Sequence, residues 1–235
     1  LGVRRQRQMC IRDRLKELTL EEKISLLTGF NSWYSNKIPR LKIPSMKMSD
    51  GPNGVRGDST SGKSSACFPC PISMGSTWNK KLIKKIGTAL GEEALDKDVD
   101  VLLGPTINLH RHPLGGRHFE NFSEDPFLTA EIAVAYVKGV QSKRVSACLK
   151  HFVANDTEFE RHTVSSNLDE RTLREVYLLP FEMGIKKAKA KSVMSAYNKL
   201  NNIYCSSNED LLVKVLKKEW GFDGYVVSDL SLIHI

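Results

Sequence analysis

The sequence predicts an α/β fold in which parallel strands alternate with helices and close into a barrel. Short apolar runs alternate along the chain with amphipathic stretches of helical length. The runs are apolar enough to be buried on both faces, as the strands of parallel sheets are. Polar residues sit at or near the ends of several runs, which favours a barrel because its strands end around one mouth. An open doubly wound sheet is the alternative, and no GxGxxG fingerprint supports it.

Composition is that of an ordinary globular chain. The 235 residues are 40% apolar and 26% charged, enough for one large domain. No apolar run approaches the roughly 18–20 residues of a membrane span, so we expect no membrane partner. The net charge is +8, of which residues 1–14 contribute half. The remainder is only mildly basic, so we expect no nucleic-acid partner.

Both ends of the chain look foreign. RRQRQMCIRD near the start and LSLIHI at the end resemble the translation of a sequencing adapter, although a basic arm and a short strand are the alternative reading. We therefore expect residues 1–14 and 230–235 to be non-native and residues 15–229 to form a partial barrel. The first fourteen residues lack the apolar segment of a signal peptide. This favours a cytoplasmic protein, although the native N-terminus is expected to be missing.

The expected elements alternate in order along the chain. Helices are predicted from apolar spacing of three to four residues and from capping residues; they cover 20–28, 78–96, 126–142, 169–188 and 208–222. Strands are predicted from short apolar runs; they cover 99–109, 145–154, 192–198 and 224–229. Residues 37–57 are punctuated by proline and read as extended chain followed by a glycine-rich turn.

Several helix ends have recognisable signals. Thr19 and Glu22 have capping-box spacing before the first helix. Asn208 is the expected N-cap of the last helix, and Gly221 its expected C′ residue. Pro180 predicts a kink or break within 169–188.

Two aspartates stand at candidate strand ends. Asp229 ends the run GYVVSD, where a carboxylate at a barrel mouth could act as a nucleophile or general base. It could equally cap a following helix. Asp50 lies in SDGPNGVR, whose turn could direct Asp50 and Arg56 into a cleft. A turn aspartate bonded to its own backbone is the commoner outcome.

Basic and aromatic residues accompany them. Lys150 and His151 are adjacent in CLKHFVA, and burial of an unpaired lysine is unfavourable, so we expect both at the mouth rather than in the core. Arg117 and Arg161 lie in polar loops, where each could bind substrate or solvent. Tyr197 ends an apolar run and could belong to the site or the core.

The cysteines and histidines predict no metal site. Cys67 and Cys70 have CxxC spacing, but no second ligand pair accompanies them, so free thiols are favoured over zinc or redox use. Acids, bases and an aromatic ring at one mouth suit a polyhydroxylated substrate, and glycoside cleavage requires carboxylates.

Several blocks resemble those of family 3 glycoside hydrolases of the β-glucosidase type. They are SDGPNGVR, GPTINLHRHPLGGRHFENFSEDP, KHFVAND, LDERTLREVYLLPFE, MSAYN and EWGFDGYVVSD, and they occur in the family's order over 16–229. The resemblance implies a (β/α)8-like TIM barrel, here incomplete at its C-terminal end. It also implies a second α/β sandwich domain, absent from this chain, and an O-glycosyl hydrolase that needs no cofactor.

The resemblance also implies roles for the motif residues. Asp229 is similar to the family's catalytic nucleophile, and Asp50 to the acid that binds outer hydroxyls of the sugar, with Arg56 in the same block. Other residues resemble groups around that sugar; these are Arg117, Lys150, His151, Arg161 and Tyr197. The expected reaction is retaining hydrolysis of terminal β-D-glucosyl residues from a β-glucoside or oligosaccharide.

Two departures leave alternatives open. The family has Trp after the nucleophile where this chain has Leu230, which the foreign tail explains, and its acid/base Glu lies in the second domain. The chain alone is therefore expected to be an inactive fragment, or a non-catalytic sugar-binding barrel. A β-N-acetylglucosaminidase branch of the family uses a His in a loop, and Asp156 and His162 occur in the corresponding loop without its motif.

Overall fold

The computed structural model of this chain describes residues 11–57 and 63–230. They belong to two compact units, Leu1–Met48 and Ser49–Ile235. Most of the two predicted foreign ends, residues 1–10 and 231–235, lies outside the described residues.

The smaller unit contains the predicted capping box. Helix α2 spans Leu20–Leu27. The Glu22 backbone N–H donates to Thr19 Oγ1 at 3.2 Å, and the Thr19 N–H donates to Glu22 Oε2 at 2.9 Å. Arg40, in the 3-10 turn η1 (Pro39–Leu41), donates to both Glu22 oxygens. The spacing therefore identified the start of this helix correctly.

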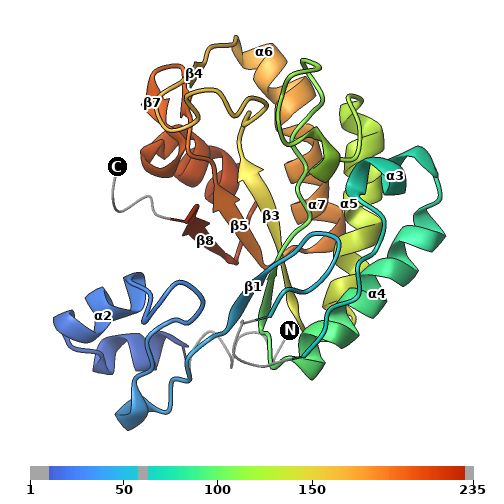
Figure 1. The fold of residues 1–235 in the computed structure, drawn as a ribbon. Coiled ribbons are helices and arrows are strands. Elements are labelled where there is room, and N and C mark those ends of the chain that lie inside the picture. Colours follow the sequence, from blue (N-terminus) through green and yellow to red (C-terminus); the bar gives the residue numbers. More distant parts are fainter. Residues whose placement is uncertain (1–10, 58–62, 231–235) are drawn as a thin grey trace. The chain divides into compact units, whose positions relative to one another are not determined.

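The larger unit is built on a five-stranded sheet (Figure 1). Its spatial order follows the chain: β1 (Met48–Asp50), β2 (Val101–Leu103), β3 (Ser146–Phe152), β5 (Ser192–Ser195) and β8 (Tyr225–Ser228). The pairs β2–β3, β3–β5 and β5–β8 are parallel. β2, β3 and β5 are almost entirely buried, as their apolar runs predict.

Helices connect successive strands. The connections contain α3 (Pro71–Ser76) and α4 (Lys80–Asp96), then α5 (Pro126–Gln141), then α6 (Glu170–Thr172), η3 (Leu173–Tyr177) and α7 (Leu179–Ala188), and finally η5 (Asp210–Glu219). Figure 1 shows α4, α5 and α7 side by side on one face of the sheet. A doubly wound sheet would place helices on both faces. Helices confined to one face of a parallel sheet instead form the outer layer of a barrel.

The predicted helix over 169–188 is three helical segments. The stretch Leu173–Tyr177 is π-helical, and the Leu178 N–H donates to the carbonyl of Leu173 at 2.8 Å, five residues earlier. Pro180 stands in the first turn of α7 and has no N–H to donate to the preceding turn. The predicted break is therefore present, and it takes the form of a widened turn before the proline.

The signals at the last helix also agree with its structure. Asn208 Oδ1 accepts from the Leu211 N–H at 3.1 Å. Gly221 follows the helix with φ +65°, the left-handed conformation that glycine tolerates. The predicted helix is largely π-helical over Asp210–Glu219, a form that apolar spacing does not distinguish from an α-helix.

A small second sheet was not expected. It joins β4 (Ser165–Ser166), β6 (Lys199–Leu200) and β7 (Ile203–Tyr204), with β4 and β6 parallel and β6 and β7 antiparallel. Its two-residue strands are too short to show a period. By connectivity it lies beyond the carboxyl ends of β3 and β5, on the side of the polar loops.

Candidate active site

A cavity of about 170 Å³ opens at the carboxyl ends of the parallel strands. It is lined by Asp50, Leu103, Arg117, Lys150, His151, Arg161, Met194, Tyr197, Asp229 and Leu230. Seven of the eight predicted site residues are in this set. The eighth, Arg56, is 75% exposed and reaches the site only through Asp50, with Nη1 3.6 Å from Oδ2.

Asp50 is positioned by the tight turn that follows β1. Gly51 has φ +129°, and a side chain there would collide with the carbonyl oxygen of Gly54, so the turn requires glycine. Lys150 Nζ donates to Asp50 Oδ1 at 2.8 Å. Burial by itself would raise the pKa of Asp50, but the charge and hydrogen bond of Lys150, assisted by Arg56, outweigh it and lower that pKa. Asp50 is therefore an ionised hydrogen-bond acceptor at neutral pH.

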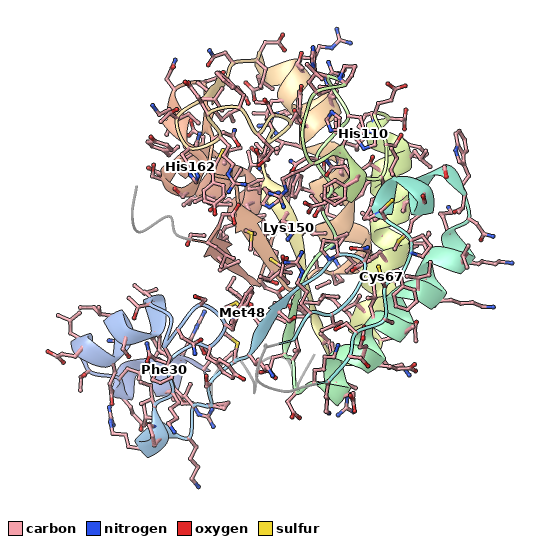
Figure 2. The ribbon with its side chains drawn as sticks, in the orientation of Figure 1. Phe30, Met48, Cys67, His110, Lys150 and His162 are labelled. Carbon is pink, nitrogen blue, oxygen red and sulfur yellow. The ribbon has the colours of Figure 1, made fainter. Side chains whose placement is uncertain are left out.

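Lys150 and His151 both line the cavity although they are consecutive in β3. A regular strand would direct them to opposite faces. The pairing of β3 with β5 shifts register between Leu149 and Phe152, and this irregularity contains both residues. Lys150 also stands at the centre of the side-chain view in Figure 2. The expectation that both residues belong to the mouth agrees with this placement.

Asn108 holds His151 in one orientation. Its side-chain Nδ2 donates to the His151 carbonyl at 2.9 Å, and its Oδ1 accepts from the His151 backbone N–H at 3.0 Å. Oδ1 also lies 3.2 Å from His151 Nδ1. An amide oxygen can only accept, so Nδ1 carries the proton and Nε2 presents a lone pair. Arg117 Nη1, at 3.4 Å, is the matching donor to Nε2.

His151 is neutral at pH 7. Burial, followed by the charges of Lys150, Arg117 and Arg161, lowers its pKa well below the usual value. Its Nε2 lies 3.6 Å from Asp229 Oδ2. Because the ring is uncharged, this contact is a close approach rather than an ion pair.

Asp229 follows β8 directly and is 6% exposed. Its Oδ1 accepts from the Leu230 N–H at 2.7 Å. Its buried Oδ2 has no hydrogen-bond partner among the described residues. Burial raises the pKa of Asp229, opposed by the Leu230 hydrogen bond, by the charges of Lys150 and Arg117 and by the nearby Tyr197 hydroxyl. The carboxylate thus has one restrained oxygen and one oxygen available to a reacting atom.

Arg117 comes from the loop after β2, at the start of the 3-10 turn η2 (His118–Glu120). Glu120 binds it through two hydrogen bonds, from Nε at 2.8 Å and from Nη2 at 3.0 Å. Burial opposes the charge of Arg117, but Glu120 outweighs it and the pKa is raised. Nη1 is left to face His151 and the cavity.

Arg161 and Tyr197 line the cavity in contact with each other. The Arg161 guanidinium lies 5.0 Å from the centre of the Tyr197 ring, and the His162 ring packs against the same ring at 4.5 Å. Burial and the charge of Asp229 raise the pKa of Tyr197 to about 12, so its hydroxyl stays protonated. That hydroxyl donates to the Leu230 carbonyl.

Asp156 and His162 are engaged separately. Asp156 Oδ1 accepts from the Leu109 N–H at 3.1 Å, whereas His162 packs on Tyr197. The described contacts therefore do not join them as a catalytic pair.

Two acids of the site were missed by the sequence reasoning. Glu120 binds Arg117, and Glu158 binds Arg161 with Oε2 2.7 Å from Nη1. Both acids lie three residues from their arginine, but that spacing predicts a pair only on a helix, and no helix is predicted at either loop. Leu103 and Met194 were also missed; Leu103 ends β2, Met194 is the next-to-last residue of β5, and neither carries a chemical signal.

No metal centre is found in the described part of the chain, where no group of three or more His, Cys, Asp or Glu side chains could hold an ion. Cys67 and Cys70 are free thiols, as are Cys148 and Cys205. Within residues 11–57 and 63–230, no helix has the length and apolarity needed to cross a membrane.

One nucleotide-type pattern does occur, which weakens the sequence-based argument against an open sheet. GDSTSGKS at residues 57–64 matches GxxxxGK[ST]. A phosphate-binding loop requires a strand directly before it and a helix directly after it. Here β1 ends at Asp50, and α3 begins only at Pro71. Residues 58–62 lie outside the described residues, and the flanking structure does not match the motif.

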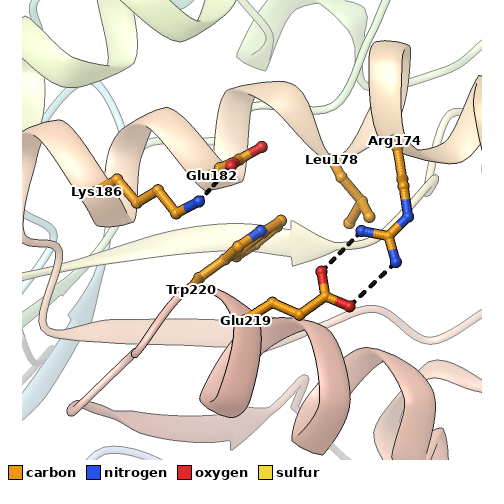
Figure 3. Close-up of a pocket in the computed structure, with 6 residues that line it drawn as sticks. All are labelled: Arg174, Leu178, Glu182, Lys186, Glu219 and Trp220. Carbon is orange, nitrogen blue, oxygen red and sulfur yellow. Dashed lines mark hydrogen bonds and ion pairs between the residues drawn. The ribbon is translucent and has the colours of Figure 1, made fainter.

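A second hollow, of about 140 Å³, lies between α7 and η5 on the helical layer (Figure 3). Arg174 pairs with Glu219 through hydrogen bonds of 2.8 and 3.2 Å, and Lys186 pairs with Glu182 at 2.6 Å. Its charged residues thus neutralise one another, and the Arg174–Glu219 pair links η3 to η5. This hollow contains none of the predicted site residues.

Solved structures share this fold. β-Glucosidase 3B from Thermotoga neapolitana, in complex with glucose, is 46% identical with a TM-score of 0.90 over 94% of this chain and 34% of that one. The Kluyveromyces marxianus β-glucosidase, in complex with glucose, is 44% identical with a TM-score of 0.91 over 93% of this chain and 26% of that one. The predicted barrel class is therefore confirmed.

Curated relatives are similar over most of this chain. A β-glucosidase of Rhizobium radiobacter is 57% identical over 93% of the chain and 27% of its own length. Thermostable β-glucosidase B of Acetivibrio thermocellus is 48% identical over 94% of the chain and 30% of its own length. The chain thus spans less than a third of the length of these relatives. Since the pattern of the glycosyl hydrolase family 3 N terminal domain extends over residues 18–235, the chain belongs to that family.

Proposed function

We propose that the protein containing this chain is a retaining β-glucosidase in which Asp229 is the nucleophile. The observation that supports this most is the cavity itself. It places a buried carboxylate with an unpartnered oxygen opposite Lys150, Arg117 and Arg161. Relatives named β-glucosidases support the choice of substrate.

In the first step, Asp229 Oδ2 attacks the anomeric carbon of a β-glucoside. The bond between that carbon and the leaving oxygen breaks, and an acid donates a proton to the leaving oxygen. A glycosyl ester on Asp229 is the intermediate. Water then attacks the anomeric carbon, gives up a proton to the same group acting as base, and releases the sugar and the free carboxylate.

The environment of Asp229 suits this role. Its raised pKa marks a carboxylate that burial makes more basic, while nearby cations favour its ionised form. Neutral His151, with its lone pair held toward Arg117, adds no proton that would compete for the nucleophile.

The proton donor comes from outside the cavity wall described here. Asp50 is the other carboxylate among the lining residues, and its lowered pKa makes it a poor general acid. Ionised Asp50 and Lys150 instead suit paired hydroxyls, which can donate to the carboxylate and accept from the ammonium. We therefore infer that this chain supplies the nucleophile and the sugar-binding groups, and that the general acid comes from elsewhere in the protein.

A sugar-binding barrel without turnover is the second candidate, because the described lining offers no acid. The two are separated in the full-length protein by hydrolysis of an aryl β-D-glucoside. Turnover supports the hydrolase, whereas glucose binding without turnover supports the binding protein.

The nucleophile is tested by Asp229→Asn in the full-length protein. We expect turnover below a few per cent of wild type with glucose binding largely retained, because a covalent nucleophile has no ready substitute. A 2-deoxy-2-fluoro-β-glucoside should label Asp229 in the wild type, as seen by peptide mass spectrometry. Asp223→Asn, the same change at an exposed position two residues before β8, is the matched control. Label on another residue would overturn the assignment.

A further inference from the structure

Glu158 stands between the two arginines that line the cavity. Its Oε2 lies 2.7 Å from Arg161 Nη1, and its Oε1 lies 4.0 Å from Arg117 Nη1. Arg117 comes from the loop after β2, and Arg161 from the loop after β3. Glu158 itself does not line the cavity. One carboxylate therefore links two loops from outside the cavity wall.

The two arginines differ in how they are otherwise held. Glu120 fixes Arg117 through two hydrogen bonds, which already set the plane of its guanidinium. For Arg161, Glu158 is the ion-pair partner, and the remaining described contact is the face of Tyr197 at 5.0 Å. A cation–π contact alone is weak and poorly directional. Arg161 therefore depends on Glu158 far more than Arg117 does.

The backbone opposite Glu158 leaves room for this arrangement. Gly116 has φ +78°, and a Cβ there would lie 3.0 Å from Cγ and 3.1 Å from Cβ of Glu158. The loop before Arg117 thus packs directly against the Glu158 side chain. Glycine at 116 allows both the left-handed backbone and the close approach.

From this geometry we infer that Glu158 is a positioning residue that holds Arg161 against Tyr197 and balances the charge between Arg161 and Arg117. The inference deepens the proposed function and rests on it for its kinetic consequences. Without the carboxylate, the two guanidinium groups repel each other across the cavity. Arg161, which is partly exposed, then turns toward solvent and no longer offers its donors to a sugar hydroxyl.

The test uses Glu158→Ala, Glu158→Gln and Glu158→Asp in the full-length protein. For Glu158→Ala we expect KM for an aryl β-glucoside to rise by about tenfold or more, with a smaller change in kcat, because a sugar-binding group is displaced. Glu158→Gln keeps the shape and loses the charge, so it should also be impaired. Glu158→Asp keeps the charge and should recover part of the loss. Glu160→Gln, an exposed acid two residues later, is the matched control.

Three outcomes would overturn the inference. Normal kinetics in Glu158→Gln would show that side-chain shape is sufficient. Unchanged KM in Glu158→Ala would show that Arg161 does not need it. Loss of one limb of the pH profile would show that Glu158 transfers a proton.

A crystal structure of Glu158→Ala separates this inference from the proposed function, since it requires no turnover. Displacement of Arg161 from Tyr197, with Arg117 still on Glu120, would support the inference even if the wild type proved inactive on β-glucosides. An Arg161 left in place would contradict it whatever the substrate.

Discussion

Lys150 is almost fully buried, and its ammonium is compensated by Asp50. In Asp50→Ala, Lys150 would lose that partner, and the sugar would lose an acceptor that tightens in the transition state. We expect kcat/KM to fall by roughly a hundredfold or more, which corresponds to a barrier higher by about 3 kcal/mol, measured with an aryl β-glucoside on the full-length protein. Gluco-configured substrates should suffer most. Unchanged kinetics in Asp50→Ala would mean that Asp50 has only a structural role in the turn after β1.

Asp156 makes stability depend on pH. Burial raises its pKa from 3.8 to about 6, although the Leu109 N–H and the charges of Arg111 and His118 oppose the change. The folded state therefore holds this proton more tightly than the unfolded state. Below about pH 4 Asp156 is protonated in both states and does not lower the free energy of unfolding. As the pH rises from about 4 to 6, the free energy of unfolding falls, and above that range the loss is complete.

Asp156→Asn should remove this penalty while its amide oxygen still accepts from Leu109. We expect the free energy of unfolding to increase by about 2–3 kcal/mol at pH 8 and to change little at pH 3.5. Urea denaturation at both pH values measures it. An equal increase in the free energy of unfolding at pH 8 and at pH 3.5 would mean that the charge of Asp156 does not cause the destabilisation.

The residue types near strand ends predicted which side chains line the cavity, but not which residues hold those side chains in place. The polar residues near strand ends converge because the carboxyl ends of parallel strands meet at one edge. The partners of Arg117 and Arg161 depend instead on loop conformation. The outward position of Arg56 depends on the turn after Gly51 in the same way.

At the scale of elements, α4 anchors the segment that follows β1. Lys97 Nζ donates to the Val55 carbonyl at 2.6 Å and to Ser65 Oγ at 2.5 Å, and it pairs with Glu93 at 3.1 Å. Glu93 in turn accepts from the backbone N–H of Ala66 at 2.7 Å. Both sides of the segment are thereby fixed to one helix, close to the turn that presents Asp50.

Lys97→Met should therefore destabilise the fold by about 3 kcal/mol, because the partly buried Glu93 carboxylate loses its cation and the Val55 carbonyl loses one of its two donors. Urea denaturation measures the change. Lys85→Met, on the exposed face of α4, should stay within about 0.5 kcal/mol of wild type. Equal effects of the two substitutions would contradict the anchoring role of Lys97.

Helix ends were predictable where a side chain caps the backbone, as at Thr19 and Asn208. The helical type was not. Apolar spacing reports which face is buried, and segments this short contain too few turns for it to separate an α-helical turn from a wider π-helical one. The widened turn before Pro180 therefore had only the proline as its signal.

At the scale of the whole molecule, the edge strands of the large sheet differ from its centre. β5 is fully buried, whereas β8 is half-buried and its last residue is exposed. An apolar strand with one unpaired side can pair with other chains.

We therefore expect the 235-residue segment, expressed by itself, to self-associate and to lack turnover. General acid catalysis is worth roughly 10²–10⁴-fold, and the described lining supplies no acid. Light scattering and an aryl β-glucoside assay test the two parts, with the full-length protein as control. A monodisperse monomer with activity would refute both parts, and a folded but inactive monomer would refute only the first.

The order β1-β2-β3-β5-β8 matches the order of synthesis. Each new strand can pair with the strand made just before it. The intervening helix can pack on that strand pair before later parts of the chain are synthesised. Such a chain can acquire structure progressively as it leaves the ribosome. The residues that line the cavity are distributed from Asp50 to Leu230, so the side chains proposed to bind sugar are in place only after the last of these strands has been translated. Substrate can therefore stabilise the finished protein, but it cannot guide the early stages of its folding.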